Sequence, residues 1–160
     1  MLLNPSDAAP GLASLSVPLV NQHGERVVLA DRVGQVTVLS FFPLSFTPVC
    51  HSELGGLAQV ADAWAEAGVY VAACSVDSRY TLRTVSDQLG LGFDLLSDFW
   101  PHGALAQKLD AFDAGRGHAT RTAFVWDASG RLVSRIEADR TASRPLDSYV
   151  EALRAAGAEL

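Results

Sequence analysis

Cys50 is the residue of this sequence best placed to do chemistry. It follows the β-prone run Val36–Phe42 and stands three residues after Thr47 and two after Pro48. Threonine is favoured at the N-cap of a helix and proline at its first position, so Cys50 is expected in the first helical turn. Backbone N–H groups there lack helical partners and the helix dipole is positive, which favours a thiolate over a thiol. The spacing therefore predicts an activated, nucleophilic cysteine.

Other uses of this segment stay open from the residues alone. Free cysteines are often small buried apolar residues, so Cys50 could simply fill space at a helix start. A binding or redox-sensing module could also use an oxidisable thiol without rapid turnover. A disulfide reductase needs a C-x-x-C pair, and the segment Pro48–His51 holds one cysteine. The Thr47 hydroxyl is expected to accept a hydrogen bond from a backbone N–H and to donate its own proton toward the sulfur or a bound substrate oxygen.

The other cysteine, Cys74, lies within the predicted strand Val69–Val76, where a buried core thiol is the expected role. Joining it to Cys50 would require Cα atoms within about 7 Å. Two cysteines cannot build the framework of a disulfide-rich secreted domain. The N-terminus has no basic region followed by an apolar one, so no signal peptide is expected. A reducing cytoplasm is the expected compartment.

Composition excludes several classes of protein. The chain has 160 residues, 49% hydrophobic and 19% charged, as in a folded globular protein, and a single domain over residues 1–160 is expected. Its net charge of −6 gives no electrostatic support to a nucleic-acid or anionic-membrane partner. The longest apolar run, Val36–Leu44, is too short to span a bilayer. His51 and His102 lack metal-ligand spacing, so neither a metal nor a cofactor is expected.

Strands and helices alternate in the expected chain order. Apolar residues recur at helical spacing from Cys50 to Trp64, and Gly68 ends that segment. The other expected elements are a hairpin of Leu15–Val20 and Arg26–Leu29 around the turn at 21–24, strands Val36–Phe42 and Val69–Val76, helix Ser78–Leu89, a short helix within Trp100–Leu109, strands Thr122–Trp126 and Leu132–Ile136, and helix Arg144–Ala156. This order predicts an α/β fold of thioredoxin-like topology, with a mixed central sheet flanked by helices and an N-terminal β-hairpin.

The segment Pro43-x-x-x-Thr47-x-x-Cys50 matches the PxxxTxxC signature of peroxiredoxins. The match is supported by further blocks in the expected order along the chain: Asp7–Pro10, Asn21–Gly24, Phe41–Thr47, Ser75–Ser78 and Leu95–Ala104. Two of these, Phe41–Thr47 and Leu95–Ala104, resemble the one-cysteine alkyl hydroperoxide reductase E type of actinobacteria. The resemblance implies the thioredoxin-like fold, peroxidase activity and a homodimer.

The resemblance also implies roles for individual residues. Cys50 matches the peroxidatic cysteine, Thr47 the hydroxyl that orients the peroxide, and Pro43 the ring that shields the thiolate from water. Arg121 matches the active-site arginine, and Glu53 resembles the carboxylate that holds this arginine. A guanidinium stays charged, so it can stabilise both a thiolate and the charge that develops on peroxide oxygens. From the residues alone, Arg121 could equally be a solvated arginine at a strand edge and Glu53 an exposed glutamate.

In the implied reaction, Cys50 attacks a hydroperoxide and becomes a sulfenic acid. Position 55 is glycine and the C-terminal tail has no cysteine, so both common places for a resolving cysteine are empty. A one-cysteine enzyme is therefore expected, reduced by an external thiol: mycothiol with a mycoredoxin, or thioredoxin. Candidate substrates are hydrogen peroxide, organic hydroperoxides and peroxynitrite. Trp100 is expected to pack, and Phe42, Leu44, Phe46 and Trp100 could line the pocket or a dimer interface.

Overall fold

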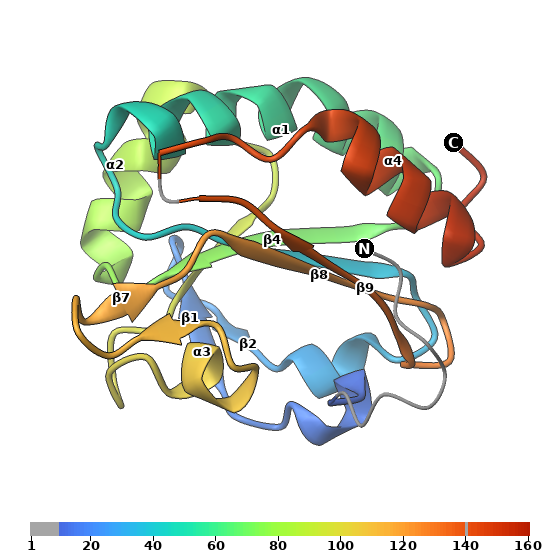
Figure 1. Ribbon diagram of the computed structural model, residues 1–160, viewed down its shortest axis with the longest axis horizontal. Helices are drawn as coiled ribbons and strands as arrows, with labels where there is room; N and C mark the ends of the chain where they lie inside the picture. Colours follow the sequence, from blue (N-terminus) through green and yellow to red (C-terminus); the bar gives the residue numbers. More distant parts are fainter. Residues whose placement is uncertain (1–9, 140) are drawn as a thin grey trace.

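A seven-stranded mixed sheet runs through the molecule in the order β2-β1-β5-β4-β3-β8-β9 (Figure 1). The computed structural model describes residues 10–139 and 141–160, so most of the Asp7–Pro10 block lies outside the described residues. The central pairs β3–β4 and β4–β5 are parallel, and the pairs β3–β8, β8–β9, β1–β5 and β1–β2 are antiparallel. The strands are β1 (Leu19–Asn21), β2 (Arg26–Val27), β3 (Thr37–Phe41), β4 (Tyr70–Ser75), β5 (Asp94–Ser97), β8 (Thr122–Trp126) and β9 (Leu132–Glu137).

Helices cover both faces of this sheet (Figure 1). One face carries α1 (Pro48–Glu66), α2 (Arg79–Leu89) and α4 (Leu146–Ala155). The opposite face carries α3 (Ala104–Lys108) and two short 3-10 turns, η1 (Leu12–Ser14) and η2 (Leu29–Arg32). A small second sheet pairs β6 (Phe112–Asp113) with β7 (His118–Ala119). The expected mixed sheet flanked by helices is confirmed. Within the described residues, no helix is long and apolar enough to cross a membrane.

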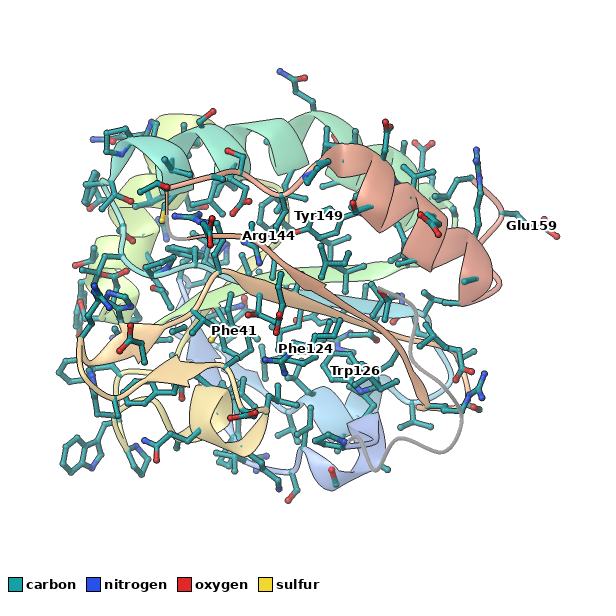
Figure 2. All side chains as sticks on the ribbon, in the orientation of Figure 1. Phe41, Phe124, Trp126, Arg144, Tyr149 and Glu159 are labelled. Atoms are coloured by element: carbon teal, nitrogen blue, oxygen red, sulfur yellow. The ribbon has the colours of Figure 1, made fainter. Side chains whose placement is uncertain are left out.

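The sheet divides the core into two apolar layers, because successive side chains of a strand point to opposite faces. Along β3, Val38 belongs to the layer under α1, whereas Leu39 and Phe41 belong to the layer over α3. All five residues of β3 are buried, which explains the unbroken apolar run in the sequence. Figure 2 shows the aromatic residues of both layers, with Tyr149 on the α1 side and Phe41, Phe124 and Trp126 on the other.

Most predicted elements are present with ends shifted by one or two residues, but the N-terminal hairpin is shorter. Its first strand begins at Leu19 rather than Leu15, directly after Pro18, which has no N–H to contribute to a ladder. The second strand ends at Val27, and η2 follows from Leu29. The hairpin itself is confirmed by the pairs Leu19–Val27 and Val20–Arg26.

One further difference affects the surroundings of Cys50. The last helix begins at Leu146, after Pro145 as its N-cap, instead of at Arg144. Proline disfavours helical backbone at the residue before it, so a helix cannot readily run from Arg144 through Pro145. Arg144 therefore lies in an extended segment that passes α1. The strands β5, β6 and β7 were not predicted.

Candidate active site

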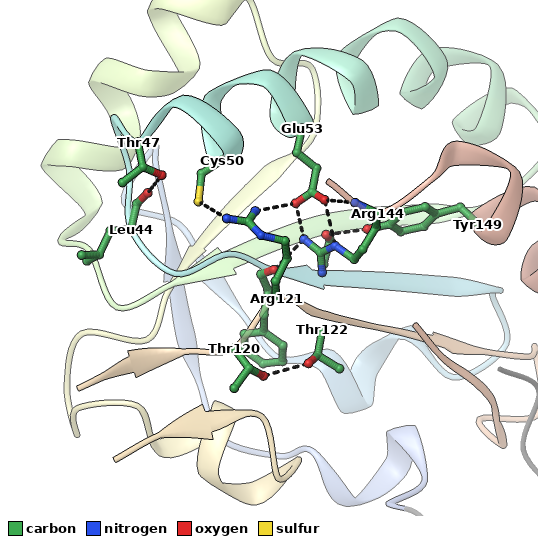
Figure 3. Close-up of polar contacts among 11 residues, drawn as sticks. Leu44, Thr47, Cys50, Glu53, Thr120, Arg121, Thr122, Arg144 and Tyr149 are labelled. Carbon is green, nitrogen blue, oxygen red and sulfur yellow. Dashed lines mark hydrogen bonds and ion pairs between the residues drawn. The ribbon is translucent and has the colours of Figure 1, made fainter. Parts of the chain in front are cut away.

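Cys50 lies in the first turn of α1, as the sequence predicts (Figure 3). Thr47 has the extended backbone of an N-cap, with φ −87° and ψ 146°, and Pro48 is the first helical residue. The carbonyl of Thr47 accepts a hydrogen bond from the backbone N–H of His51 at 2.9 Å. Cys50 is 1% exposed and belongs to the apolar layer between α1 and the sheet. The sulfur therefore lies near the positive end of a helix, largely shielded from solvent.

Arg121 and Glu53 meet Cys50 inside the protein. Arg121 stands directly before β8, and its Nη2 donates to the Sγ of Cys50 at 3.2 Å. Its Nη1 donates to Oε1 of Glu53 at 3.0 Å. Both residues are buried, at 3% and 7% exposure, so neither is the solvated surface residue that the sequence left open. The guanidinium thus lies between the sulfur and a carboxylate (Figure 3).

Arg144 completes this network, and no motif in the sequence pointed to it. Its backbone N–H and its Nε donate to Oε2 of Glu53 at 2.7 and 3.0 Å, and its Nη2 reaches Oε1. Burial raises the pKa of Glu53, but the hydrogen bonds and charge of Arg144, together with the charge of Arg121, outweigh burial and lower it below its ordinary value. Glu53 is therefore a carboxylate held between two buried cations.

The segment that carries Arg144 is fixed to the sheet. Nη2 of Arg144 donates to the carbonyl of Phe41, the last residue of β3, at 2.7 Å. Five residues after Arg144, Tyr149 shares a hydrogen bond of 2.9 Å with the hydroxyl of Ser40 on the same strand. Tyr149 is fully buried. The C-terminal helix and the segment before it are thus both tied to β3 (Figure 2).

The Thr47 hydroxyl differs from the prediction. It donates to the carbonyl of Leu44 at 3.1 Å and makes no capping hydrogen bond to a backbone N–H. The chain turns sharply between these two residues, where Phe46 has φ +64°, and this turn brings the Leu44 carbonyl to the hydroxyl. The N-cap position is confirmed, but the expected side-chain cap is wrong.

Asp77 anchors the same turn from the end of β4. Its Oδ2 accepts hydrogen bonds from the backbone N–H of Ser45 at 2.9 Å and from the Ser45 hydroxyl at 2.8 Å. The Ser75 hydroxyl donates to the same oxygen at 2.6 Å. In the sequence, Asp77 stood out only as part of the Ser75–Ser78 block, with no role assigned. The structure assigns it to positioning the segment that leads into α1.

A pocket of about 310 Å³ opens beside Cys50. Its lining joins the start of α1 to the segment before β8: Pro43, Leu44, Thr47, Pro48, Val49, His118, Arg121 and Thr141. Pro43 is buried, Thr47 is half-buried, and Arg121 links the lining to the sulfur. In the part of the chain that the structure describes, no three His, Cys, Asp or Glu side chains lie close enough to hold a metal ion.

His118 belongs to the lining of this pocket, and His102 and Trp100 do not. His118 lines it, although the sequence gave no signal for this residue. His102 is exposed and contacts the carbonyl of Gly117 at 2.6 Å through Nε2. Trp100 is 82% exposed, so the expectation that it packs is wrong, and it borders a separate hollow with Tyr80.

Cys74 and Cys50 lie on opposite faces of the sheet. Cys74 is on β4, fully buried in the layer over α3, whereas Cys50 belongs to the layer under α1. Both cysteines are free. Burial, together with the nearby charge of Asp98, raises the pKa of Cys74 well above its usual range, so this residue is a neutral thiol. The expected core role of Cys74 agrees with its position.

Known proteins are similar to this chain in sequence and in fold. The AhpC/TSA family matches residues 5–135. Alkyl hydroperoxide reductase E of Mycobacterium tuberculosis is 37% identical over 130 residues, which cover 81% of this chain and 82% of that protein. AhpC of Enterococcus faecalis superimposes with a TM-score of 0.78 at 26% identity, covering 88% of this chain and 86% of that one. Peroxidoxin BcpB of Mycobacterium tuberculosis shares the fold, with a TM-score of 0.77 at 23% identity over 93% of this chain and 95% of that one. This chain therefore belongs to the AhpC/TSA family of peroxiredoxins, thiol-dependent peroxidases with the thioredoxin-like fold.

Proposed function

We propose that this protein is a one-cysteine peroxidase in which Cys50 reduces hydrogen peroxide, organic hydroperoxides and peroxynitrite. The observation that carries the proposal is the 3.2 Å contact between Nη2 of Arg121 and Sγ of Cys50 in the first turn of α1. A fixed cation and the helix N-terminus both stabilise a thiolate at this position. These two groups are in place at the sulfur of Cys50 before a substrate binds.

The reaction is an in-line displacement. The thiolate attacks the terminal oxygen of the peroxide, an S–O bond forms and the O–O bond breaks. The sulfur is oxidised to a sulfenic acid, and the other oxygen leaves with the electron pair and takes up a proton. Arg121 stabilises the charge on the reacting atoms, and Glu53 holds Arg121 in place. Pro43 limits water access, and the Thr47 hydroxyl turns from the Leu44 carbonyl toward the bound peroxide.

The sulfenic acid is then reduced by an external thiol. This step is supported by the positions of Cys50 and Cys74 on opposite faces of the sheet, since a disulfide between them would require β4 or α1 to leave its place. Mycothiol with a mycoredoxin, or thioredoxin, is the reductant that we infer.

A second copy of this chain is the partner that we propose for the exposed aromatic surface. Four apolar side chains gather around a hollow of about 290 Å³, and three of them are more than half exposed: Val20, Tyr80, Phe99 and Trp100. Exposed apolar patches of this kind mark interaction sites on soluble proteins. We place the dimer in the cytoplasm, where a reducing pool would keep both thiols free.

Stopped-flow tryptophan fluorescence with intact mass tests this function. Reduced wild type, Cys50→Ser and Cys74→Ala are mixed with hydrogen peroxide and an organic hydroperoxide. We expect fast oxidation that adds one oxygen in wild type and Cys74→Ala, and none in Cys50→Ser. Oxidation no faster than that of an ordinary free thiol would overturn the peroxidase. Loss of two hydrogens, abolished in Cys74→Ala, would overturn the one-cysteine cycle, and oxidation that no thiol reverses would favour a redox sensor.

A further inference from the structure

His118 contributes the one imidazole to the lining of the pocket beside Cys50. It lies on β7, three residues before Arg121, and is 8% exposed. Pro43, Thr47 and Arg121 line the same pocket, and Arg121 contacts the sulfur directly. A hydroperoxide that enters this pocket therefore meets both the His118 ring and the guanidinium that contacts the sulfur.

The hydrogen bonding of His118 fixes which ring nitrogen is available. Nδ1 lies 2.9 Å from the carbonyl oxygen of Ala119. A carbonyl can only accept, so Nδ1 carries a proton and Nε2 is the nitrogen that can exchange one. Among the residues that the structure describes, this is the only hydrogen bond of the ring. Nε2 is thus free to meet a ligand in the pocket.

Within residues 10–139 and 141–160, no carboxylate makes a hydrogen bond to His118. Asp113, its register partner on β6, accepts hydrogen bonds from the backbone N–H and the Nη1 of Arg116, both at 3.1 Å. The charged group that shares the pocket lining is the guanidinium of Arg121, which already serves Cys50 and Glu53. Because arginine does not give up its proton, Arg121 can stabilise a leaving oxygen but cannot protonate it. Histidine is the side chain suited to that transfer near neutral pH.

We propose that His118 is the general acid for the leaving oxygen of the peroxide, an inference that rests on the proposed peroxidase function. The Cys50 thiolate bonds to the terminal oxygen, the O–O bond breaks, and its electron pair leaves as alkoxide. Nε2 of the imidazolium gives its proton to that alkoxide, which departs as an alcohol, and neutral His118 is reprotonated by water. Sulfur is oxidised to sulfenic acid and the peroxide is reduced, so charge and atoms balance. In-line displacement places the leaving oxygen on the side of the attacked oxygen opposite the sulfur.

Two peroxides of nearly equal size distinguish a loss of proton transfer from a change in the shape of the pocket, because only one of them has a leaving group that needs a proton. Ethyl hydroperoxide expels ethoxide, a strong base that needs a proton, whereas peracetic acid expels acetate, a weak base that does not. Oxidation of Cys50 is followed by stopped-flow fluorescence in wild type, His118→Leu and His118→Gln, with His23→Gln as an exposed histidine control. We expect the rate constant for ethyl hydroperoxide, divided by that for peracetic acid, to fall on the order of 100-fold in both His118 variants. The control should keep the wild-type ratio.

The outcomes distinguish this inference from the function on which it rests. An unchanged ratio, whether both rates fall together or neither falls, overturns the role of His118 and leaves the peroxidase intact. Wild type that reacts with neither peroxide faster than a free thiol overturns the peroxidase, and the general acid with it. His118→Gln keeps a polar side chain of similar length, so it provides the ratio if His118→Leu fails to fold.

Discussion

The backbone N–H and the guanidinium of Arg144 both donate to the carboxylate of Glu53, 91 positions earlier in the chain. The same carboxylate accepts from Arg121, which contacts the sulfur of Cys50. One buried carboxylate thus holds the C-terminal segment, the start of β8 and the first turns of α1 together. Removal of the negative charge of Glu53 would leave the two buried guanidinium groups without their shared counter-charge.

Glu53→Gln is therefore expected to lower the free energy of unfolding by about 3–5 kcal/mol, because breaking a buried ion pair leaves its partners uncompensated. Equilibrium unfolding in urea measures this change. Glu66→Gln, at the exposed end of the same helix, is the matched control and should leave stability nearly unchanged. An equal effect of both substitutions would show that the network does not stabilise the fold.

The same carboxylate makes stability depend on pH in a defined direction. The pKa of Glu53 is lower in the folded protein than in the unfolded chain. Its stabilisation is thus fully present above the unfolded value, about 4.3, and is lost as pH falls through the folded value. The difference in unfolding free energy between wild type and Glu53→Gln should shrink below about pH 4. A difference that stays constant down to pH 2 would contradict this assignment.

Arg121→Lys should slow oxidation of Cys50 on the order of 100-fold while preserving the charge. Lysine offers a point charge instead of a planar fork, so it cannot contact the sulfur and Glu53 at the same time. Stopped-flow fluorescence with hydrogen peroxide measures the rate constant. Arg154→Lys, exposed on α4, serves as the control. A wild-type rate in Arg121→Lys would mean that charge alone, without the geometry of the guanidinium, is sufficient.

Asp77→Asn should loosen the turn that leads into α1. The substitution weakens the charge-assisted hydrogen bonds from Ser45 and leaves most of the packing in place. We expect slower Cys50 oxidation, by about tenfold or more since misplaced catalytic groups are costly, and faster proteolytic cleavage at residues 44–47. Asp87→Asn, which removes an exposed ion pair with Arg83, controls for the loss of a surface charge. Slower oxidation without faster cleavage would argue against a positioning role.

Cys74 should resist alkylation in the folded protein. It is fully buried, and burial raises the pKa of its thiol, so neither access nor thiolate is available near neutral pH. Iodoacetamide followed by intact mass should give no adduct on folded Cys50→Ser and one adduct when that variant is unfolded in urea. Rapid modification of Cys74 in folded Cys50→Ser would contradict the packing of β4.

Features that depend on residues close together in the chain could be predicted from the sequence. The cap and proline at Thr47-Pro48 start α1 where predicted, because helix initiation is governed by contacts within one turn. The strand Thr122–Trp126 was predicted with its observed ends. The PxxxTxxC spacing pointed to Cys50, and the family resemblance predicted that Arg121 and Glu53 belong to the same site.

Which distant groups contact these residues depends on the folded chain and could not be predicted from local patterns. Arg144 reaches Glu53, and Asp77 reaches Ser45 across 32 positions, through chain packing that no local pattern encodes. The Thr47 hydroxyl faces the Leu44 carbonyl because the turn at Phe46 is held from β4, so local capping preference does not decide its partner. His118 enters the pocket in the same way, through a two-residue strand too short to leave a periodic signal. Hydrogen-bond partners far apart in sequence are chosen by burial and chain path, and these exist only in the folded protein.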